Sequence, residues 1–310
     1  MLFRSAQDHP APNLPSDPVK LLKQEIPPEV PERIGTYLES ARLLGVRSAE
    51  LHLALASDSE NPDFAPEPFT SHYRRGLFQS MRNLAVTNLR ALRKQVKTLA
   101  PGLAPLAQRV ADLESPIIES YRGLYQRRIA AKRLRTHGDF HLAQVLWTGK
   151  DFMFIDFEGE STVPIGERRI KRTPIRDAAT MARSFHYVAC VGLDQHVQRG
   201  SIPHENRPKF EPWLQYWNLW VTVAYLKAYL QTIGKSGILP DNDEDLQVLL
   251  RSHLISSAIH ELGGELRKRS ERLRIPILGI LSLMGDLPML TPAHGNSQAA
   301  RSEAPASAKA

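Results

Sequence analysis

The clearest chemical signature of this sequence lies between His137 and Glu158. The string His137-Gly138-Asp139 is followed by Gln144, five positions after Asp139, and by Asp156, 17 positions after Asp139. Phosphoryl transfer needs this set of groups: one carboxylate orients and deprotonates the attacking hydroxyl, while a second carboxylate and an amide oxygen hold Mg²⁺ against the triphosphate of a nucleotide. The residue types and their order therefore predict a phosphotransferase.

The chain around these residues is expected to bring them together. Two short apolar runs, at 144–147 and 152–155, flank the turn-forming stretch Thr148-Gly149-Lys150-Asp151. Two such runs around a glycine-containing loop predict a β-hairpin. A tight hairpin places the start of its first strand beside the end of its second, so we expect Asp139, Gln144 and Asp156 to converge.

The spacing agrees with the protein-kinase pattern His-Arg-Asp-Leu-x-x-x-Asn followed by Asp-Phe-Gly. Gly138 replaces the arginine, as in kinases that act on small molecules. A metal-hydrolase site built on His137 and His141 is the alternative, but Gly138 is a poor helix residue and no His-x-x-x-His helix with an internal Glu is present. At least one of the two histidines is expected to have only a structural role, and Asp156 could cap the end of the hairpin.

The rest of the chain predicts a mostly α (α+β) protein with one small β element. Residues 1–30 are rich in proline and polar residues and are expected to form a flexible leader, and residues 289–310 a disordered tail. Residues 31–288 form the expected domain. Its apolar residues recur at helical spacing in several segments, at 31–57, 70–99, 104–133, 175–192, 211–233, 243–269 and 276–286.

Composition narrows the functional class. The single cysteine, Cys190, excludes an internal disulfide and a cysteine-based zinc site, which fits a cytoplasmic protein. No apolar run approaches the ~18 residues that a membrane span needs. The net charge of +7 suits any polyanionic ligand, including nucleotide phosphates. Because the basic residues are dispersed and no zinc-finger, RNP or helix-turn-helix signature is present, we expect no nucleic-acid partner.

Weaker candidates lie outside the hairpin. Asp177 is expected to charge the start of a helix and to tie down the catalytic loop. The basic run from Glu167 to Arg172 could clamp a phosphate or the acceptor, or simply be solvated. Glu261 and Glu265, one helical turn apart, could reach the hydroxyls of a sugar or face water.

The sequence resembles the bacterial maltokinases, including the maltokinase part of trehalose synthase fusions. The resemblance rests on the string from His137 to Asp151, on Ile-Asp-Phe-Glu-Gly-Glu at 155–160, on 167–177 and on Arg183-Ser-Phe-His-Tyr187. Segments at 37–45, 49–56, 64–69 and 274–280 extend it, so that it spans roughly residues 30–285.

The resemblance implies a fold related to aminoglycoside phosphotransferases and protein kinases. Its implied reaction transfers the γ-phosphate of ATP, with Mg²⁺, to the anomeric hydroxyl of maltose, giving maltose 1-phosphate for α-glucan (glycogen) synthesis. Asp139 would be the general base, and Gln144 and Asp156 the Mg²⁺ ligands. His137, Glu158 and Asp177 would support them, while Arg172, Glu261 and Glu265 are the candidates for binding the sugar.

Such kinases also have an N-terminal β-rich lobe with a phosphate-covering loop. No strand pattern or glycine-rich loop precedes residue 30, so we expect this chain to hold the C-terminal lobe, with the N-lobe missing or separately encoded. Trehalose synthase is a second possible partner. The competing hypotheses are an inactive fragment or pseudokinase that acts as a binding module, and a kinase for another small sugar.

Overall fold

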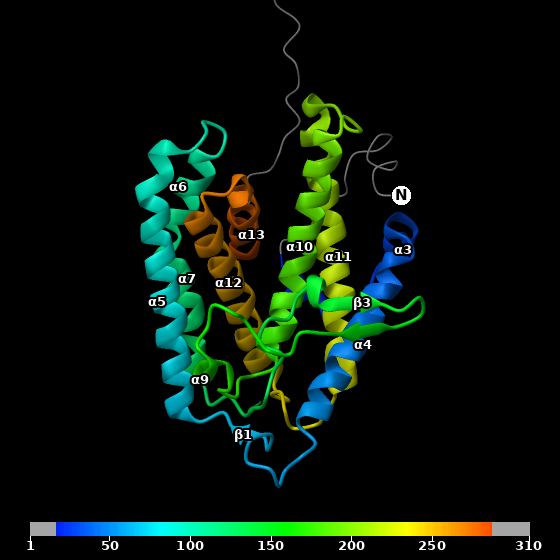
Figure 1. The fold of residues 1–310 in the computed structure, drawn as a ribbon, viewed down its shortest axis with the longest axis vertical. Coiled ribbons are helices and arrows are strands. Elements are labelled where there is room, and N and C mark those ends of the chain that lie inside the picture. The colour runs from blue at the N-terminus through cyan, green and yellow to red at the C-terminus, as the bar shows by residue number, and fades with distance from the viewer. Residues whose placement is uncertain (1–16, 287–310) are drawn as a thin grey trace, which may run out of the picture.

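The computed structural model describes residues 17–286 of the 310-residue chain. Long helices form most of it, and two small antiparallel sheets lie at one end and along one side (Figure 1). The helices are α2 (Pro18–Leu21), α3 (Glu29–Ile34), α4 (Tyr37–Leu55), α5 (Ser71–Gln95), α6 (Ala104–Asp112), α7 (Glu114–Tyr121), α8 (Gly123–Gln126), α9 (Ile165–Arg168), α10 (Ile175–Gln198), α11 (Arg207–Ile233), α12 (Asp243–Lys268) and α13 (Arg274–Met284). This confirms the prediction of a mostly helical protein.

Helices α4, α10, α11 and α12 build the core. Helix α11 buries side chains around most of its circumference, as a helix in the middle of a bundle must. It packs along α4 on one side and α10 on the other. At the crossing with α4 the backbones nearly touch, because a Cβ atom at Gly45 would lie 2.3 Å from the carbonyl oxygen of Tyr225. Only glycine permits this approach.

A second helical layer covers α12. Helix α5 packs against α6, α7, α8 and α12 (Figure 1). The single helix expected over 104–133 is instead three short helices, and the first break falls at Leu113. Pro116 explains this break, because its ring removes the hydrogen bond to residue 112 and clashes with the carbonyl there. The sequence pattern of apolar residues continues across the break, which is why periodicity alone missed it.

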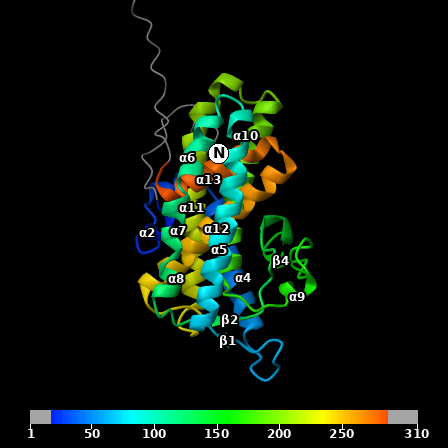
Figure 2. The same ribbon diagram turned by 90° about the vertical axis from the view of Figure 1, so that its left-hand side faces the viewer.

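The predicted hairpin is confirmed. Strands β3 (Val145–Trp147) and β4 (Phe152–Phe154) pair antiparallel, with Leu146 opposite Met153. A second pair, β1 (Glu67–Pro68) with β2 (Lys132–Arg133), joins the loop after α4 to the segment before His137. One further bridge links Leu134 to Arg172. Figure 2 shows that β4 and α9 lie together on one side of the helical body.

The structure describes part of the predicted leader at 1–30 and none of the predicted tail at 289–310. Within the expected leader, residues 17–30 include α2, whose Val19 and Leu21 are buried, so this part of the segment is packed. Residues 1–16 and the expected tail at 289–310 lie outside the described residues. Among residues 17–286, no helix is both long enough and apolar enough to cross a lipid bilayer.

Candidate active site

Asp177, in the first turn of α10, holds the segment His137-Gly138-Asp139, which we call the catalytic loop after its predicted role. The backbone N–H of His137 donates to Oδ2 of Asp177 at 2.7 Å, and that of Gly138 donates to Oδ1 at 3.3 Å. Gly138 has a φ of +86°, a left-handed conformation in which the arginine of the protein-kinase pattern would be strained. The left-handed backbone conformation at position 138 therefore favours glycine there.

Asp177 belongs to a buried chain of polar groups. Nε2 of His52 lies 3.4 Å from Oδ2 of Asp177, and Nδ1 of His52 lies 2.9 Å from the hydroxyl of Tyr229. All three side chains are almost completely buried. Burial raises the pKa of Asp177, but the hydrogen bond and charge of His52 and the other donors outweigh it, so the pKa lies below its ordinary value. Asp177 is therefore an ionised anchor.

Asp139 faces the open side of the same loop. Phe140 is fully buried against the rings of His137 and Phe154, whereas the side chains of Asp139 and His141 are each one-third exposed. Nδ1 of His141 accepts from the N–H of Ala143, which leaves Nε2 to donate to Oδ1 of Asp139 at 3.4 Å. This hydrogen bond holds the pKa of Asp139 below its ordinary value, and the carboxylate is ionised at neutral pH.

The hairpin brings Gln144 and Asp156 into contact. Nε2 of Gln144 donates to Oδ2 of Asp156 at 3.0 Å, and the N–H of Ile155 donates to the carbonyl of Gln144 at 3.1 Å. Nε2 of His137 donates to the carbonyl of Ile155 at 2.8 Å, which ties the catalytic loop to the end of β4. Gln144 and Asp156 therefore meet as the hairpin implies, and the hydrogen bond from His137 joins the loop that carries Asp139 to the same end of the hairpin.

Asp156 has a φ of +65°. Non-glycine residues adopt this conformation at a cost, and such strain gathers at functional sites. The carboxylate is also exposed, so it is presented to solvent beside the Gln144 amide. This backbone conformation could not be predicted from the sequence, because the strained position holds Asp156 and not a glycine.

The donor set fits Mg²⁺. In the described part of the chain, no three His, Cys, Asp or Glu side chains gather as a metal cage. Mg²⁺ does not need one, because it keeps several waters and is bound by one or two carboxylates together with substrate phosphates. Asp156 and the amide oxygen of Gln144, adjacent and open to solvent, offer that partial set.

The remaining predicted site residues are less closely grouped. Glu158 is exposed. Glu261 forms a two-pronged ion pair with Arg183, at 3.1 and 2.8 Å, and Glu265 is buried with Oε2 unpaired. Arg172 is half-buried, and burial followed by the charge of Arg176 lowers its pKa. The structure does not bring Glu261 or Glu265 into direct contact with Asp139.

Sequence reasoning missed Glu160. Its carboxylate lies 3.5 Å from Nε2 of His260 on α12 and accepts from the hydroxyl of Thr162 at 2.7 Å. The hydrogen bond from His260 lowers the pKa of Glu160 to about 2. Its negative charge acts on Asp139, whose pKa it raises slightly against the effect of His141. A residue whose partner lies 100 positions away on another helix leaves no local pattern to find.

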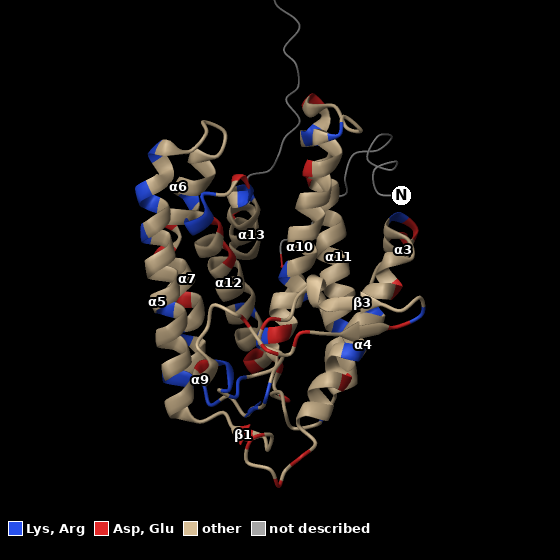
Figure 3. Ribbon diagram, viewed as in Figure 1, with Lys and Arg blue, Asp and Glu red and all other residues tan. Residues whose placement is uncertain are grey.

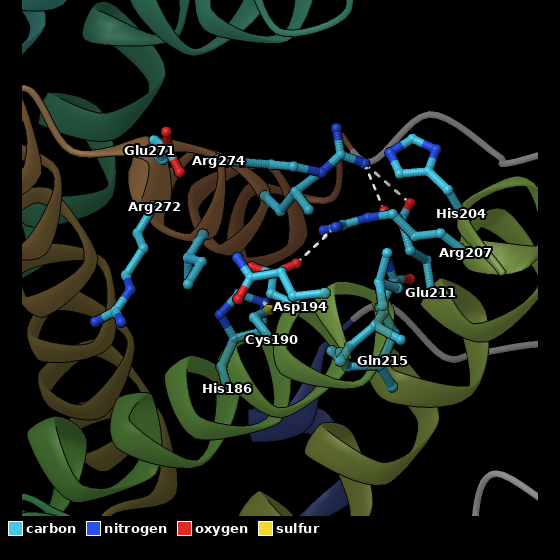
Figure 4. A pocket seen from close by; sticks show the side chains of 16 residues that line it. His186, Cys190, Asp194, His204, Arg207, Glu211, Gln215, Glu271, Arg272 and Arg274 are labelled. Atoms are coloured by element: carbon cyan, nitrogen blue, oxygen red, sulfur yellow. Dashed lines mark hydrogen bonds and ion pairs between the residues drawn. The ribbon is translucent and has the colours of Figure 1, made fainter. Parts of the chain in front are cut away.

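A cavity of about 300 Å³ lies farther along α10, between α11 and α13. Figure 4 shows Arg207 reaching Asp194 and Arg274 reaching Glu211. Its cationic and anionic side chains balance, and burial raises the pKa of the Cys190 thiol to about 12, so the thiol is inert. Asp139, Gln144 and Asp156 do not line this cavity, and the predicted chemistry lies elsewhere.

The arrangement of helices and strands is similar to that in solved structures of glucosamine kinase. Structures of glucosamine kinase, in one crystal form and in complex with glucosamine, ADP and inorganic phosphate, each superpose with a TM-score of 0.62 at 19% sequence identity over 87% of this chain. This likeness establishes the fold.

The similarity in sequence is shorter. The glucosamine kinase of Mycolicibacterium smegmatis (strain ATCC 700084 / mc(2)155) is 27% identical over 166 residues, which is 51% of this chain. The chain covers 35% of that relative's length, and 58% and 59% of the two solved chains. No family model matches the sequence.

Proposed function

We propose that this chain is the catalytic, helical lobe of an ATP-dependent sugar kinase with a protein-kinase-like fold. One observation carries the proposal: Asp177 fixes the loop that carries the partly exposed Asp139, and His137 ties this loop to the end of the hairpin that carries the exposed Gln144–Asp156 pair. Phosphoryl transfer depends almost entirely on positioning and charge stabilisation, and this arrangement supplies fixed carboxylates at a solvent-accessible surface.

Each residue has a distinct role in the proposal. Asp139, ionised at neutral pH, accepts the proton of the sugar hydroxyl as it attacks. Gln144 and Asp156 would hold Mg²⁺, which neutralises charge on the triphosphate when bound. His137 maintains the spacing between the two halves through its hydrogen bond to Ile155.

Two acceptors follow from independent arguments. The sequence resemblance favours maltose, phosphorylated at its anomeric hydroxyl in a maltokinase-type reaction. The relatives of similar fold are named for glucosamine, so this amino sugar is the second acceptor. Because the chain covers little more than half of the solved relatives, a lobe that covers the nucleotide, supplied by a partner chain or an adjoining segment, is part of the proposal.

The test is release of ADP from Mg·ATP with maltose or glucosamine as acceptor, together with calorimetric binding of Mg·ATP. Replacing a general base costs about 10²–10⁴-fold in rate, so Asp139→Asn should lower kcat by at least about 100-fold without weakening Mg·ATP binding. Asp241→Asn, at an exposed residue between α11 and α12, is the matched control. An unchanged rate in Asp139→Asn would refute the assignment of the base.

The competing function is a binding module without kinase activity. Exposure of apolar side chains on the hairpin, including Leu146 (48%) and Met153 (55%), favours it, since such surfaces often contact partners. Asp156→Asn discriminates between the two. A kinase site should lose Mg·ATP affinity in this variant, whereas a module that never binds nucleotide shows no heat of binding before or after the change.

A further inference from the structure

A second cavity, of about 400 Å³, lies beside the segment at 133–135 that leads into the catalytic loop. We define it as the basic pocket; it is lined by Pro62, Asp63, Phe64, Glu67, Arg133, Arg135, Arg169, Ile170 and Lys171. Figure 3 shows Lys and Arg gathered in the loops near α9, where these segments lie. None of the residues assigned to phosphoryl transfer lines it.

Two of its cations share the carboxylate of Glu67 and have structural roles. Lys171, only 7% exposed, donates to the carbonyls of Pro62 and Ala65 and lies 3.1 Å from Glu67. Arg133 pairs with the other oxygen of Glu67 at 2.6 Å. These contacts fasten the loop at 62–67 over the pocket, so the walls are built without any ligand.

The other two cations have no such partners. Arg135 donates to the backbone carbonyl of Arg169 at 3.0 Å. Within residues 17–286, neither guanidinium is within ion-pair distance of a carboxylate. The lining holds four cationic side chains and two carboxylates, so its net charge is two positive. Two guanidiniums offer planar, paired donors that match the oxygens of a phosphate group.

We propose that the basic pocket binds the phosphate group of a small phosphorylated molecule, held between Arg135 and Arg169. A phosphate monoester carries about −1.5 to −2 at neutral pH, which balances the charge of the lining, whereas a single carboxylate would leave one cation uncompensated. The volume admits a sugar-sized body attached to the phosphate, and inorganic phosphate alone would share the same donors.

The pocket also adjoins the catalytic loop. Leu134 and Arg172 exchange both backbone hydrogen bonds, each 2.9 Å long, and Arg135 lies two residues before His137. A ligand that joins Arg135 to Arg169 therefore clamps the two sides of this bridge. Occupancy should slow hydrogen exchange at the amides of Leu134 and Arg172.

The experiment is calorimetry on the full 310-residue chain with glucose 6-phosphate, with inorganic phosphate and with glucose. Binding of one equivalent of the ester, alone or with inorganic phosphate, supports the proposal, and the two arms separate a phosphorylated metabolite from free phosphate. Arg169→Gln removes an exposed side chain with no folding contact and should weaken binding at least about tenfold, the cost of a charged hydrogen bond. Arg135→Gln should do the same.

Arg82→Gln, an exposed arginine on α5, is the matched control and should leave affinity within about twofold. The proposal is overturned if Arg169→Gln binds as tightly as the unaltered chain, or if glucose binds equally well. It is also overturned if a 20-nucleotide single-stranded DNA binds more tightly than the phosphate ester and Arg82→Gln weakens DNA binding as much as Arg169→Gln does. That result would indicate a diffuse basic surface that binds any polyanion. Asp156→Asn should leave phosphate binding intact, so failure of the kinase proposal would not affect this result.

Discussion

The two sides of the catalytic loop are built differently. Beneath it, Asp177, His52 and Tyr229 are buried and bonded to one another and to the loop backbone. Above it, Asp139 is one-third exposed and Asp156 is strained and open to solvent. Removing a buried bonded group costs stability, whereas an exposed one costs little. The contrast indicates that the lower side holds the loop in position and that the carboxylates of the upper side contribute little to folding, as the kinase proposal requires.

The largest expected effect tests the lower side. Asp177→Ala should lower the free energy of unfolding by about 3 kcal/mol or more, because it leaves His52 and two backbone N–H groups without an acceptor. Urea denaturation followed by circular dichroism measures it. Asp63→Ala should stay within about 0.5 kcal/mol. Equal losses in the two variants would contradict the anchoring role of Asp177.

The next prediction concerns the upper side and has the opposite sign. Asp156→Gly should raise the free energy of unfolding by roughly 1 kcal/mol, because glycine adopts a positive φ without strain. The same change should abolish Mg·ATP binding. Arg269, at a φ of +48° where α12 ends, is the matched control. Arg269→Gly should gain similar stability with unchanged nucleotide affinity; a loss of stability in Asp156→Gly would contradict the strain argument.

The smallest effect is a dependence of stability on acid. The folded-state pKa of Glu160, about 2, is below its usual 4.5, so the interaction of its carboxylate with His260 contributes stability that is present at pH 5 and is lost as the pH falls from 4.5 toward 2. Because the pair is partly exposed, screening limits the effect to less than about 1 kcal/mol. Glu160→Gln should remove this part of the acid-induced loss in urea titrations at pH 2.5 and 5. An unchanged pH profile would show that the pair contributes nothing.

The sequence predicts the parts of the site that depend on neighbours along the chain. Two apolar runs around Gly149 suffice for the hairpin, and the hairpin suffices to join Gln144 to Asp156. Asp177 was expected to tie down the catalytic loop, and its hydrogen bonds to His137 and Gly138 are those the hypothesis requires.

The parts that could not be predicted depend on distant contacts. His52 meets Asp177 across 125 positions and Glu160 meets His260 across 100, and neither pair has a local pattern. Glu261 and Glu265 showed the spacing of one helical face, but packing decides whether a carboxylate on that face meets Arg183 or remains unpaired. Spacing identifies a face of a helix and not the neighbour it meets.

The close crossing at Gly45 has a consequence for how the site moves. Helix α4 carries Arg47, whose guanidinium grips Asp151 at the hairpin turn at 2.8 and 2.9 Å, and, five residues on, His52. Five residues of helix span about 7.5 Å. The backbone of α4 packs closely against α11, and α4 therefore fixes the separation between the turn of the hairpin and the buried side chains that support the catalytic loop. Because one helix makes both contacts, a displacement of α4 would move the turn of the hairpin and the buried support of the loop together.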